Sequence, residues 1–157
     1  MRTASLLHFT KKILATGAVL IICFNATVFA QNEVDAVKKL LHTYNSAMQK
    51  LDTIGTAELF ADSSLIVESG NVEGTYQQYE VHHIGPELSE FKSFKYSGYK
   101  ANVVLDGDYA FATEIFKYKI VGRKSKKVSE RNAVTTSVLK KIRGEWKITV
   151  MHLSSHK

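Results

Sequence analysis

The C-terminal part of the chain, residues 94–156, is built from long runs in which apolar and polar residues alternate, separated by short turns. An Asp-Gly-Asp turn at 106–108 and an Arg-Gly turn at 143–144 are typical of tight hairpins. Strands that follow one another through hairpins pair antiparallel, so the pattern predicts a meander of four long strands. Because long strands twist and bend, the sheet should be strongly curved.

One amphipathic helix precedes the strands. Between residues 33 and 51, apolar side chains recur at spacings of three and four, which places them on one face of a helix. Shorter helices are expected over 54–61 and 75–84. Gly85-Pro86 should interrupt the second, because proline lacks an N–H and clashes with the preceding turn. A short strand is expected at 64–68.

Helices followed by an antiparallel sheet indicate an α+β fold with a cavity between the long helix and the concave side of the sheet. The predicted buried face consists of Val34, Val37, Leu41, Tyr44, Met48 and Leu51.

The first thirty residues have the pattern of a secretory signal peptide. A basic start is followed by an apolar run at 13–24, and the small residues within 28–30 predict cleavage after Ala30. The alternative is an N-terminal membrane anchor, but the apolar run is short for a spanning helix. We expect a periplasmic or secreted protein in which residues 31–157 form one domain, with no membrane span after cleavage.

Cysteine usage and charge fit export. The only cysteine, Cys23, lies within the signal, so the mature domain needs no disulfide, as expected in a bacterial periplasm or exterior. Loss of the three basic residues of the signal lowers the formal net charge from +6 to +3. The remaining basic cluster at 123–127 lies between two predicted strands. We interpret it as a solvated hairpin tip rather than a nucleic-acid or anionic-lipid contact, because no aromatic residues are interleaved with it.

Three motifs resemble the nuclear transport factor 2-like superfamily, which also includes ketosteroid isomerase and the SnoaL-like polyketide cyclases. They are the segment 59–62 before the strand that ends at Glu68, Glu73-Gly74 at the start of the third helix, and 144–148 with His152 and Ser154 near the chain end. The resemblance covers residues 33–156 and is greatest to an exported bacterial branch. It implies a cone-shaped fold, in which N-terminal helices pack on a curved antiparallel sheet, a pocket at the wide end, and a homodimer through the sheet. Members include enzymes, binding modules and assembly domains, so the fold does not fix the function.

Glu68 is the first candidate for chemistry, since it ends a short strand near the expected mouth of the pocket. In ketosteroid isomerases a carboxylate at the corresponding place abstracts a proton, so the resemblance implies Glu68 as a general base and Tyr44 as an oxyanion donor. Those enzymes also use a protonated acid on a sheet strand, whereas the only acid between 128 and 142 is Glu130. The alternative is a solvent-exposed Glu68 and a Tyr44 buried in the core.

Two histidines could meet in the same pocket. His83 lies four residues after Tyr79 on the aromatic face of the third helix, and His152 lies near the end of the last strand. With Glu87 they would supply ligands for zinc or copper, although Gly85-Pro86 should disrupt the helix that aligns Glu87 with His83. The alternative is a buried His83 that is hydrogen-bonded to a carboxylate, a serine or a tyrosine.

The last strand should face the pocket with one set of alternate side chains. Trp146 starts an apolar stripe on this face, and the stripe continues into His152, Ser154 and His156. Aromatic residues such as Tyr79 would line an apolar pocket or simply fill the core. The expected ligand contacts are Tyr79, His83, Trp146, His152 and Ser154.

The preferred function is binding of a small, partly apolar molecule or a metal ion in the pocket. Isomerase-type or cyclase-type proton transfer by Glu68 is the alternative, and a purely structural dimer through the open sheet face is a third possibility. The sequence has no phosphate-binding loop, no Gly-x-Ser-x-Gly motif and no cysteine in the mature chain to act as a nucleophile.

Overall fold

The computed structural model describes residues 30–157. The predicted signal peptide therefore lies outside the described residues, except for Ala30. The chain divides into two units, Met1–Asp35 and Ala36–Lys157. The described part of the first unit, 30–35, is helical. None of the described helices combines the length and the apolar character that a membrane crossing requires.

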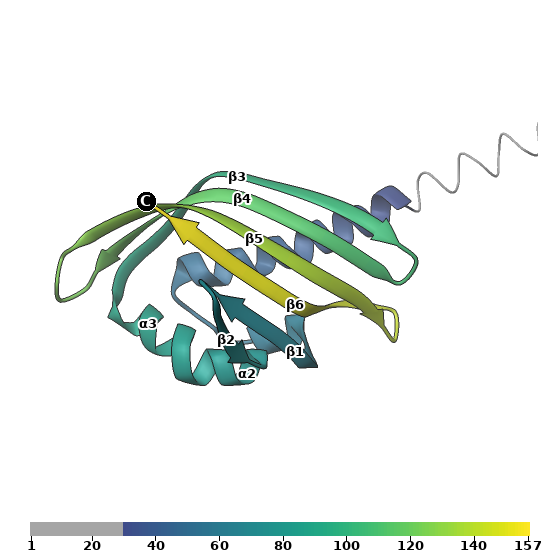
Figure 1. Cartoon of the computed structure of the whole chain (residues 1–157), viewed down its shortest axis with the longest axis horizontal. Coiled ribbons are helices and arrows are strands. Elements are labelled where there is room, and N and C mark those ends of the chain that lie inside the picture. Colours follow the sequence, from purple (N-terminus) through teal and green to yellow (C-terminus); the bar gives the residue numbers. More distant parts are fainter. Residues whose placement is uncertain (1–29) are drawn as a thin grey trace, which may run out of the picture. The chain divides into compact units, whose positions relative to one another are not determined.

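A six-stranded sheet in the order β2-β1-β6-β5-β4-β3 forms most of the larger unit (Figure 1). The last four strands along the chain form the predicted antiparallel meander. β1 runs parallel to β6 and antiparallel to β2, so the sheet is mixed rather than wholly antiparallel. The strands are β1 (Phe60–Glu68), β2 (Asn71–Gly74), β3 (Phe91–Asp106), β4 (Tyr109–Gly122), β5 (Val128–Ile142) and β6 (Glu145–His156).

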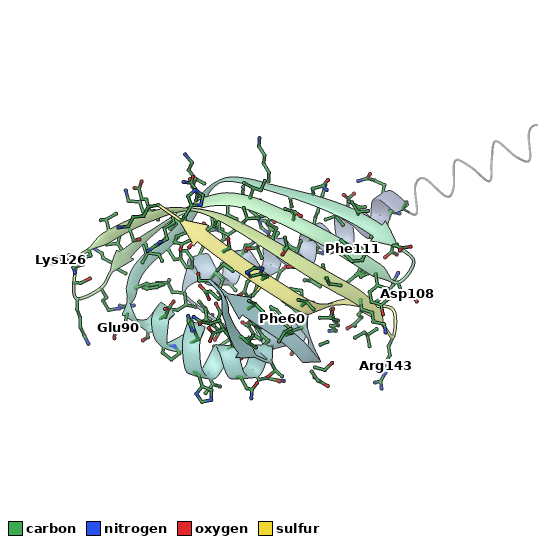
Figure 2. All side chains as sticks on the ribbon, in the orientation of Figure 1. Phe60, Glu90, Asp108, Phe111, Lys126 and Arg143 are labelled. Atoms are coloured by element: carbon green, nitrogen blue, oxygen red, sulfur yellow. The ribbon has the colours of Figure 1, made fainter. Side chains whose placement is uncertain are left out.

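The first helix, of which residues 36–50 belong to the larger unit, packs against one face of this sheet. Four residues of its predicted apolar face, Val37, Leu41, Tyr44 and Met48, are 0–8% exposed. Side chains of the strands and of the later helices meet them to form one core (Figure 2). Among these core residues are Phe60, Tyr76, Leu88, Phe94, Ala112, Leu139, Trp146, Ile148 and Met151.

The segment before β1 differs from the prediction. Residues expected to form a helix over 54–61 form a single 3-10 turn, η1 (Thr56–Leu59), and β1 begins at Phe60 rather than at Ser64. Phe60 pairs with Ile148 of β6. Pairing with a distant strand therefore overrides the local helical preference of this segment, as tertiary context often does.

The Gly85-Pro86 pair does not break the third helix. α2 (Tyr76–Tyr79), a π-helical turn η2 (Glu80–Ile84) and α3 (Gly85–Glu90) follow one another without interruption. The N–H of Gly85 donates to the carbonyl of Glu80, five residues earlier. The wider π turn accommodates the proline at the start of α3, where its missing N–H and its ring cost little. The prediction of a helix break was therefore wrong.

The basic hairpin tip joins β4 to β5. Lys126 lies at the opposite end of the sheet from the turns that carry Asp108 and Arg143 (Figure 2). Arg123 is not simply solvated, because its Nε donates to the carbonyl of Ser89 at 3.1 Å and its Nη2 donates to the carbonyl of Phe91 at 3.0 Å. These bonds satisfy carbonyls at the C-terminal end of α3.

A β-bulge in the last strand changes which side chains face inward. Leu139 of β5 pairs with Ile148, but the preceding residue, Val138, pairs with Val150, so Thr149 is an extra residue in β6. The hydroxyl of Thr149 donates to the carbonyl of Val138 at 3.0 Å. An extra residue reverses the alternation beyond it. The predicted continuous face from Trp146 to His156 was therefore wrong.

Candidate functional site

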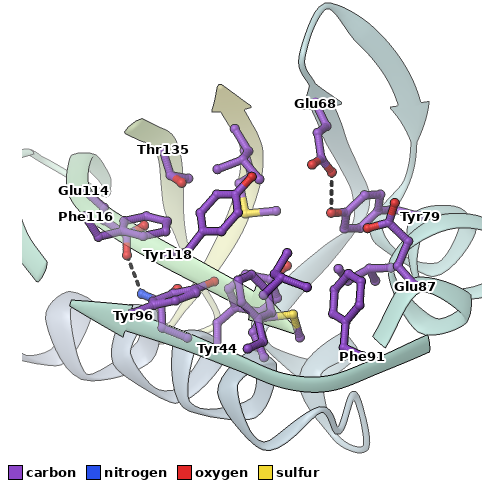
Figure 3. Close-up of a pocket in the computed structure, with 17 residues that line it drawn as sticks. Tyr44, Glu68, Tyr79, Glu87, Phe91, Tyr96, Glu114, Phe116, Tyr118 and Thr135 are labelled. Atoms are coloured by element: carbon purple, nitrogen blue, oxygen red, sulfur yellow. Dashed lines mark hydrogen bonds between the residues drawn. The ribbon is translucent and has the colours of Figure 1, made fainter. Parts of the chain in front are cut away.

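A cavity lies between the first helix, the concave face of the sheet and the helical segment 76–90 (Figure 3). The space within it that is open to the centres of water molecules is about 60 Å³. Aromatic and aliphatic side chains predominate in its wall. The polar residues of the wall outside the tyrosines are Asn45, Glu68, Glu87, Glu114 and Thr135.

Glu68 marks one end of the cavity, where β1 ends. The hydroxyl of Tyr79 donates to Glu68 Oε2 at 2.6 Å. His83 Nε2 lies 3.7 Å from the same oxygen, and the rings of Tyr79 and His83 stack with centroids 5.2 Å apart. Of the three side chains predicted to converge in the pocket, Glu68 and His83 therefore lie together, with Tyr79 beside them, whereas His152 does not join them.

Two further carboxylates surround His83. Glu73 Oε2 lies 3.2 Å from Nδ1, and Glu87 Oε1 lies 3.5 Å from Nε2. Because the helix is not broken at Gly85-Pro86, Glu87 lies close to His83 after all. With Glu68, three carboxylates are therefore within ion-pair distance of one imidazole.

Glu114 marks another part of the cavity and was not among the predicted residues. It is 3% exposed. Asn45 Nδ2 donates to Glu114 Oε1 at 2.6 Å, and the hydroxyl of Tyr99 donates to the same oxygen at 2.7 Å. Burial raises the pKa of Glu114, and these two hydrogen bonds oppose the rise.

The sequence does contain a signal for Glu114. Lys117 and Lys119 alternate with Phe116 and Tyr118 in the sequence of β4, which indicates that the apolar pair faces inward, and Glu114 has the same parity along the strand. The resemblance places a second acid within 128–142, whereas the acid that lines the cavity lies on the neighbouring strand, β4.

Tyrosine hydroxyls are the other polar groups of the wall. Tyr44 is 8% exposed and lines the cavity, as predicted. Burial is the main cause that raises the pKa of Tyr44 and of Tyr79 well above the ordinary tyrosine value. Both phenols therefore stay protonated at neutral pH and are available as hydrogen-bond donors.

Several predicted contacts lie elsewhere. His152, Ser154 and His156 are exposed on the outer side of β6, because the bulge turns Met151 and Leu153 into the cavity wall instead. In keeping with this reversal, the hydroxyls of Ser155 and Tyr118 are hydrogen-bonded at 3.0 Å.

Trp146 is buried in the core but is not part of the cavity wall. The Nζ of Lys141 lies 5.7 Å from the centroid of its ring. Trp146 is therefore a core residue rather than the ligand contact that was predicted.

The predicted metal ligands do not come together. His83 and Glu87 are near one another, but His152 is on the outer side of the sheet. Within residues 30–157, no group of three or more His, Cys, Asp or Glu side chains is arranged to hold a metal ion. His83, His152 and Glu87 are therefore not brought together as the prediction required.

Replacing Glu114 by glutamine should stabilise the protein at neutral pH. Burial raises the pKa of Glu114 in the folded state above its ordinary value of 4.5. The folded state therefore binds the carboxyl proton of Glu114 more tightly than the unfolded state does. The free energy of unfolding then falls as the pH rises from about 4.5 to the folded pKa. Each unit of the shift corresponds to about 1.4 kcal/mol. Glu114→Gln removes this pH-dependent loss of stability and keeps a carbonyl acceptor for Asn45 and Tyr99.

Urea unfolding of parent and variant between pH 4 and pH 8 tests this. The two curves should coincide at the acid end, and the variant should become the more stable as the pH rises. A variant that is less stable than the parent at pH 7 would contradict a raised pKa for Glu114.

Comparison with known proteins places the chain in a family. The profile of the family described as "SnoaL-like domain" matches residues 37–156. No curated protein matches the chain significantly.

Several solved structures share the fold of this chain. A nuclear transport factor 2-like superfamily protein from Salmonella enterica has a TM-score of 0.69 at 18% identity and covers 78% of this chain and 90% of its own. A candidate dehydratase of the same superfamily from Streptomyces avermitilis has a TM-score of 0.69 at 17% identity, covering 81% and 98%. A candidate ketosteroid isomerase from Shewanella frigidimarina has a TM-score of 0.62 at 26% identity, covering 76% and 94%.

Proposed function

The chain belongs to the SnoaL-like domain family, with the nuclear transport factor 2-like α+β fold, and from this premise we propose that it binds a small, partly apolar molecule in the cavity. The observation that carries the proposal is an aromatic cavity with buried or half-buried carboxylates at Glu68 and Glu114. Small-molecule sites combine an apolar wall with a few polar groups that orient the ligand. Burial raises the pKa of the Glu114 carboxylate, because removing its charge from water costs free energy. A cavity that served only as core would gain nothing from this cost.

Native mass spectrometry of the protein recovered from its cell envelope tests this proposal. We expect a small molecule that is retained under mild conditions, on a chain whose mass corresponds to cleavage after Ala30. Tyr118→Trp places a larger ring in the cavity wall and should abolish retention. Tyr109→Trp, the same change at an exposed position, should not. A parent protein that carries nothing and binds no member of a metabolite library would overturn the proposal.

Proton transfer is the second candidate function, and the surroundings of Glu68 favour it. Its Oε2 accepts from Tyr79 at 2.6 Å and lies near His83. This arrangement orients the carboxylate and places an imidazole beside it, as a general base with a proton partner would require. Glu114 supplies the second acid that the ketosteroid isomerase resemblance requires, and candidate dehydratases and isomerases are among the similar structures.

If the protein is an enzyme of this kind, Glu68→Gln should lower turnover of a panel of enones and hydroxyketones by a factor of about 10² to 10⁴. The variant should still bind the ligand. Turnover that persists in Glu68→Gln would exclude Glu68 as the base.

We also propose that two copies of the chain associate through the outer face of the sheet. A row of paired apolar residues crosses five strands on this face, and Phe111, its member on β4, is 48% exposed. The row consists of Val104, Phe111, Val138, Val150 and Leu65. Exposed apolar patches commonly mark interfaces. The homodimer stays a prediction, which sedimentation of the parent protein and of Phe111→Glu would test, with a dimer expected only for the parent.

A further inference from the structure

The cavity wall is acidic, whereas the chain as a whole is basic. The chain carries 21 Lys and Arg against 15 Asp and Glu. Yet none of the 17 described residues that line the cavity is Lys, Arg or His, whereas Glu68, Glu87 and Glu114 all line it. An anionic ligand would find no opposite charge in the wall. A cation would meet three carboxylates.

Aromatic rings form much of the remaining wall. Seven of the lining residues are Tyr or Phe, and in Figure 3 Tyr96, Phe116 and Tyr118 lie around one side of the space. Tyr96 and Phe116 stack with centroids 4.4 Å apart. Rings attract an organic cation that is placed over their faces, and the attraction strengthens when the cation is removed from water.

Glu114 offers an oxygen without a partner. Both hydrogen bonds to this residue, from Asn45 and Tyr99, end on Oε1. No hydrogen bond from a residue within 30–157 reaches Oε2, although the side chain is 3% exposed and lines the cavity. Among the described residues, Ser137 Oγ is the one fully buried side-chain atom that lacks a partner, so Glu114 Oε2 is not sealed off and remains accessible to a donor in the cavity.

We propose that the ligand of this cavity is a small organic cation, an amine whose ammonium group binds Glu114 Oε2 while its apolar body lies among the aromatic rings. The proposal rests on the proposed function and adds the chemical class of the ligand. Glu68, Glu73 and Glu87 near His83 supply further negative charge at the other end of the cavity. Their field draws cations towards the cavity.

Binding should release a proton. Burial raises the pKa of the empty Glu114 carboxyl, and an ammonium group beside it favours the ionised form. The proton of any neutral Glu114 then passes to the buffer as the ion pair forms. A neutral ligand that accepts a hydrogen bond from the protonated carboxyl would release none.

Three single-ring probes of similar size separate the charge classes: benzylamine, benzyl alcohol and benzoate. In isothermal titration at pH 6–7 and low salt, benzylamine should bind about ten to a hundred times more tightly than benzyl alcohol, as expected for a hydrogen bond to a charged group. Benzoate should bind most weakly. Titrations in buffers with different ionisation enthalpies should show proton release for benzylamine alone.

Glu114→Gln should remove the preference for benzylamine and leave the binding of benzyl alcohol nearly unchanged. The matched control is Glu130→Gln, which removes an exposed carboxylate outside the cavity wall and should leave all three affinities unchanged. Because Glu114→Gln is expected to be the more stable protein at neutral pH, its loss of amine binding would not reflect misfolding.

Equal or tighter binding of benzyl alcohol or benzoate would overturn the cation assignment and leave the proposed small-molecule function standing. Benzylamine binding that survives Glu114→Gln would overturn the role of Glu114. If none of the three probes binds, the organic-cation class is rejected, and the retained molecule seen by native mass spectrometry decides the function independently.

Discussion

Replacing Tyr76 by alanine should lower the free energy of unfolding by about 3–5 kcal/mol, as for other large aromatic residues removed from a core. Tyr76 is 1% exposed. Its ring stacks on Phe60 with centroids 3.8 Å apart and meets the edge of Tyr44 at 6.0 Å. Its hydroxyl is hydrogen-bonded to Thr56 Oγ1 at 2.6 Å. The alanine variant therefore loses the packing of α2 against η1, β1 and the first helix together.

Tyr76→Phe is the matched control, because it keeps the ring and removes only the hydroxyl. It should cost about 1 kcal/mol, the usual net worth of one hydrogen bond, since Thr56 Oγ1 retains its bond to the carbonyl of Thr53. Urea unfolding of the three proteins gives both differences. An alanine variant within about 1 kcal/mol of the parent would show that this ring is not part of the core.

Replacing Gly85 by alanine should destabilise the protein by about 1–3 kcal/mol, the usual cost of overpacking. A Cβ at this position would lie 2.5 Å from the carbonyl oxygen of Glu80, which is backbone and has little freedom to move. The π turn that closes between these two residues would have to open. His83 and Glu87 lie on either side of this point, so their positions around Glu68 should change as well.

The sign of this effect makes the experiment decisive. Alanine is favoured over glycine in an ordinary helix by up to about 1 kcal/mol, so a regular helix at 85 would be stabilised by the same substitution. Gln77→Ala, at an exposed position of α2, is the control and should leave stability within about 0.5 kcal/mol of the parent. A more stable Gly85→Ala variant would contradict the π turn.

The regular helices and strands of the fold could be predicted from the sequence. The helical spacing of Val37, Leu41, Tyr44 and Met48 identified the buried face of the first helix, and the alternation after residue 94 identified the meander. Both depend on many residues that agree with one another. Glu68, Tyr79 and His83 were found for a similar reason, because each lies at the end or on the inner face of a regular element.

The local irregularities could not be predicted. Nothing in the sequence around Thr149 marks it as the extra residue of a bulge, because the bulge depends on how β6 aligns with Val138 and Leu139. This one residue moved His152 and Ser154 from the predicted site to the outer face. At Gly85-Pro86 the sequence does mark an irregularity, but a widened turn and a break share the same signal. Glu114 is different, since its parity with Phe116 and Tyr118 along β4 does indicate an inward position.

The parallel pairing of β1 with β6 has a consequence for how the protein is made. Phe60 and Glu68 find their partners Ile148 and Leu153 more than eighty residues later. Closing so long a loop is slow, since its entropy is lost before the contacts form. β1 has no partner towards the centre of the sheet until β6 has formed, so the cavity cannot be completed before residues 145–156 are in place. Assembly of the cavity therefore depends on the arrival of β6, and a chain truncated before β6 should expose β1 as an open edge prone to aggregation.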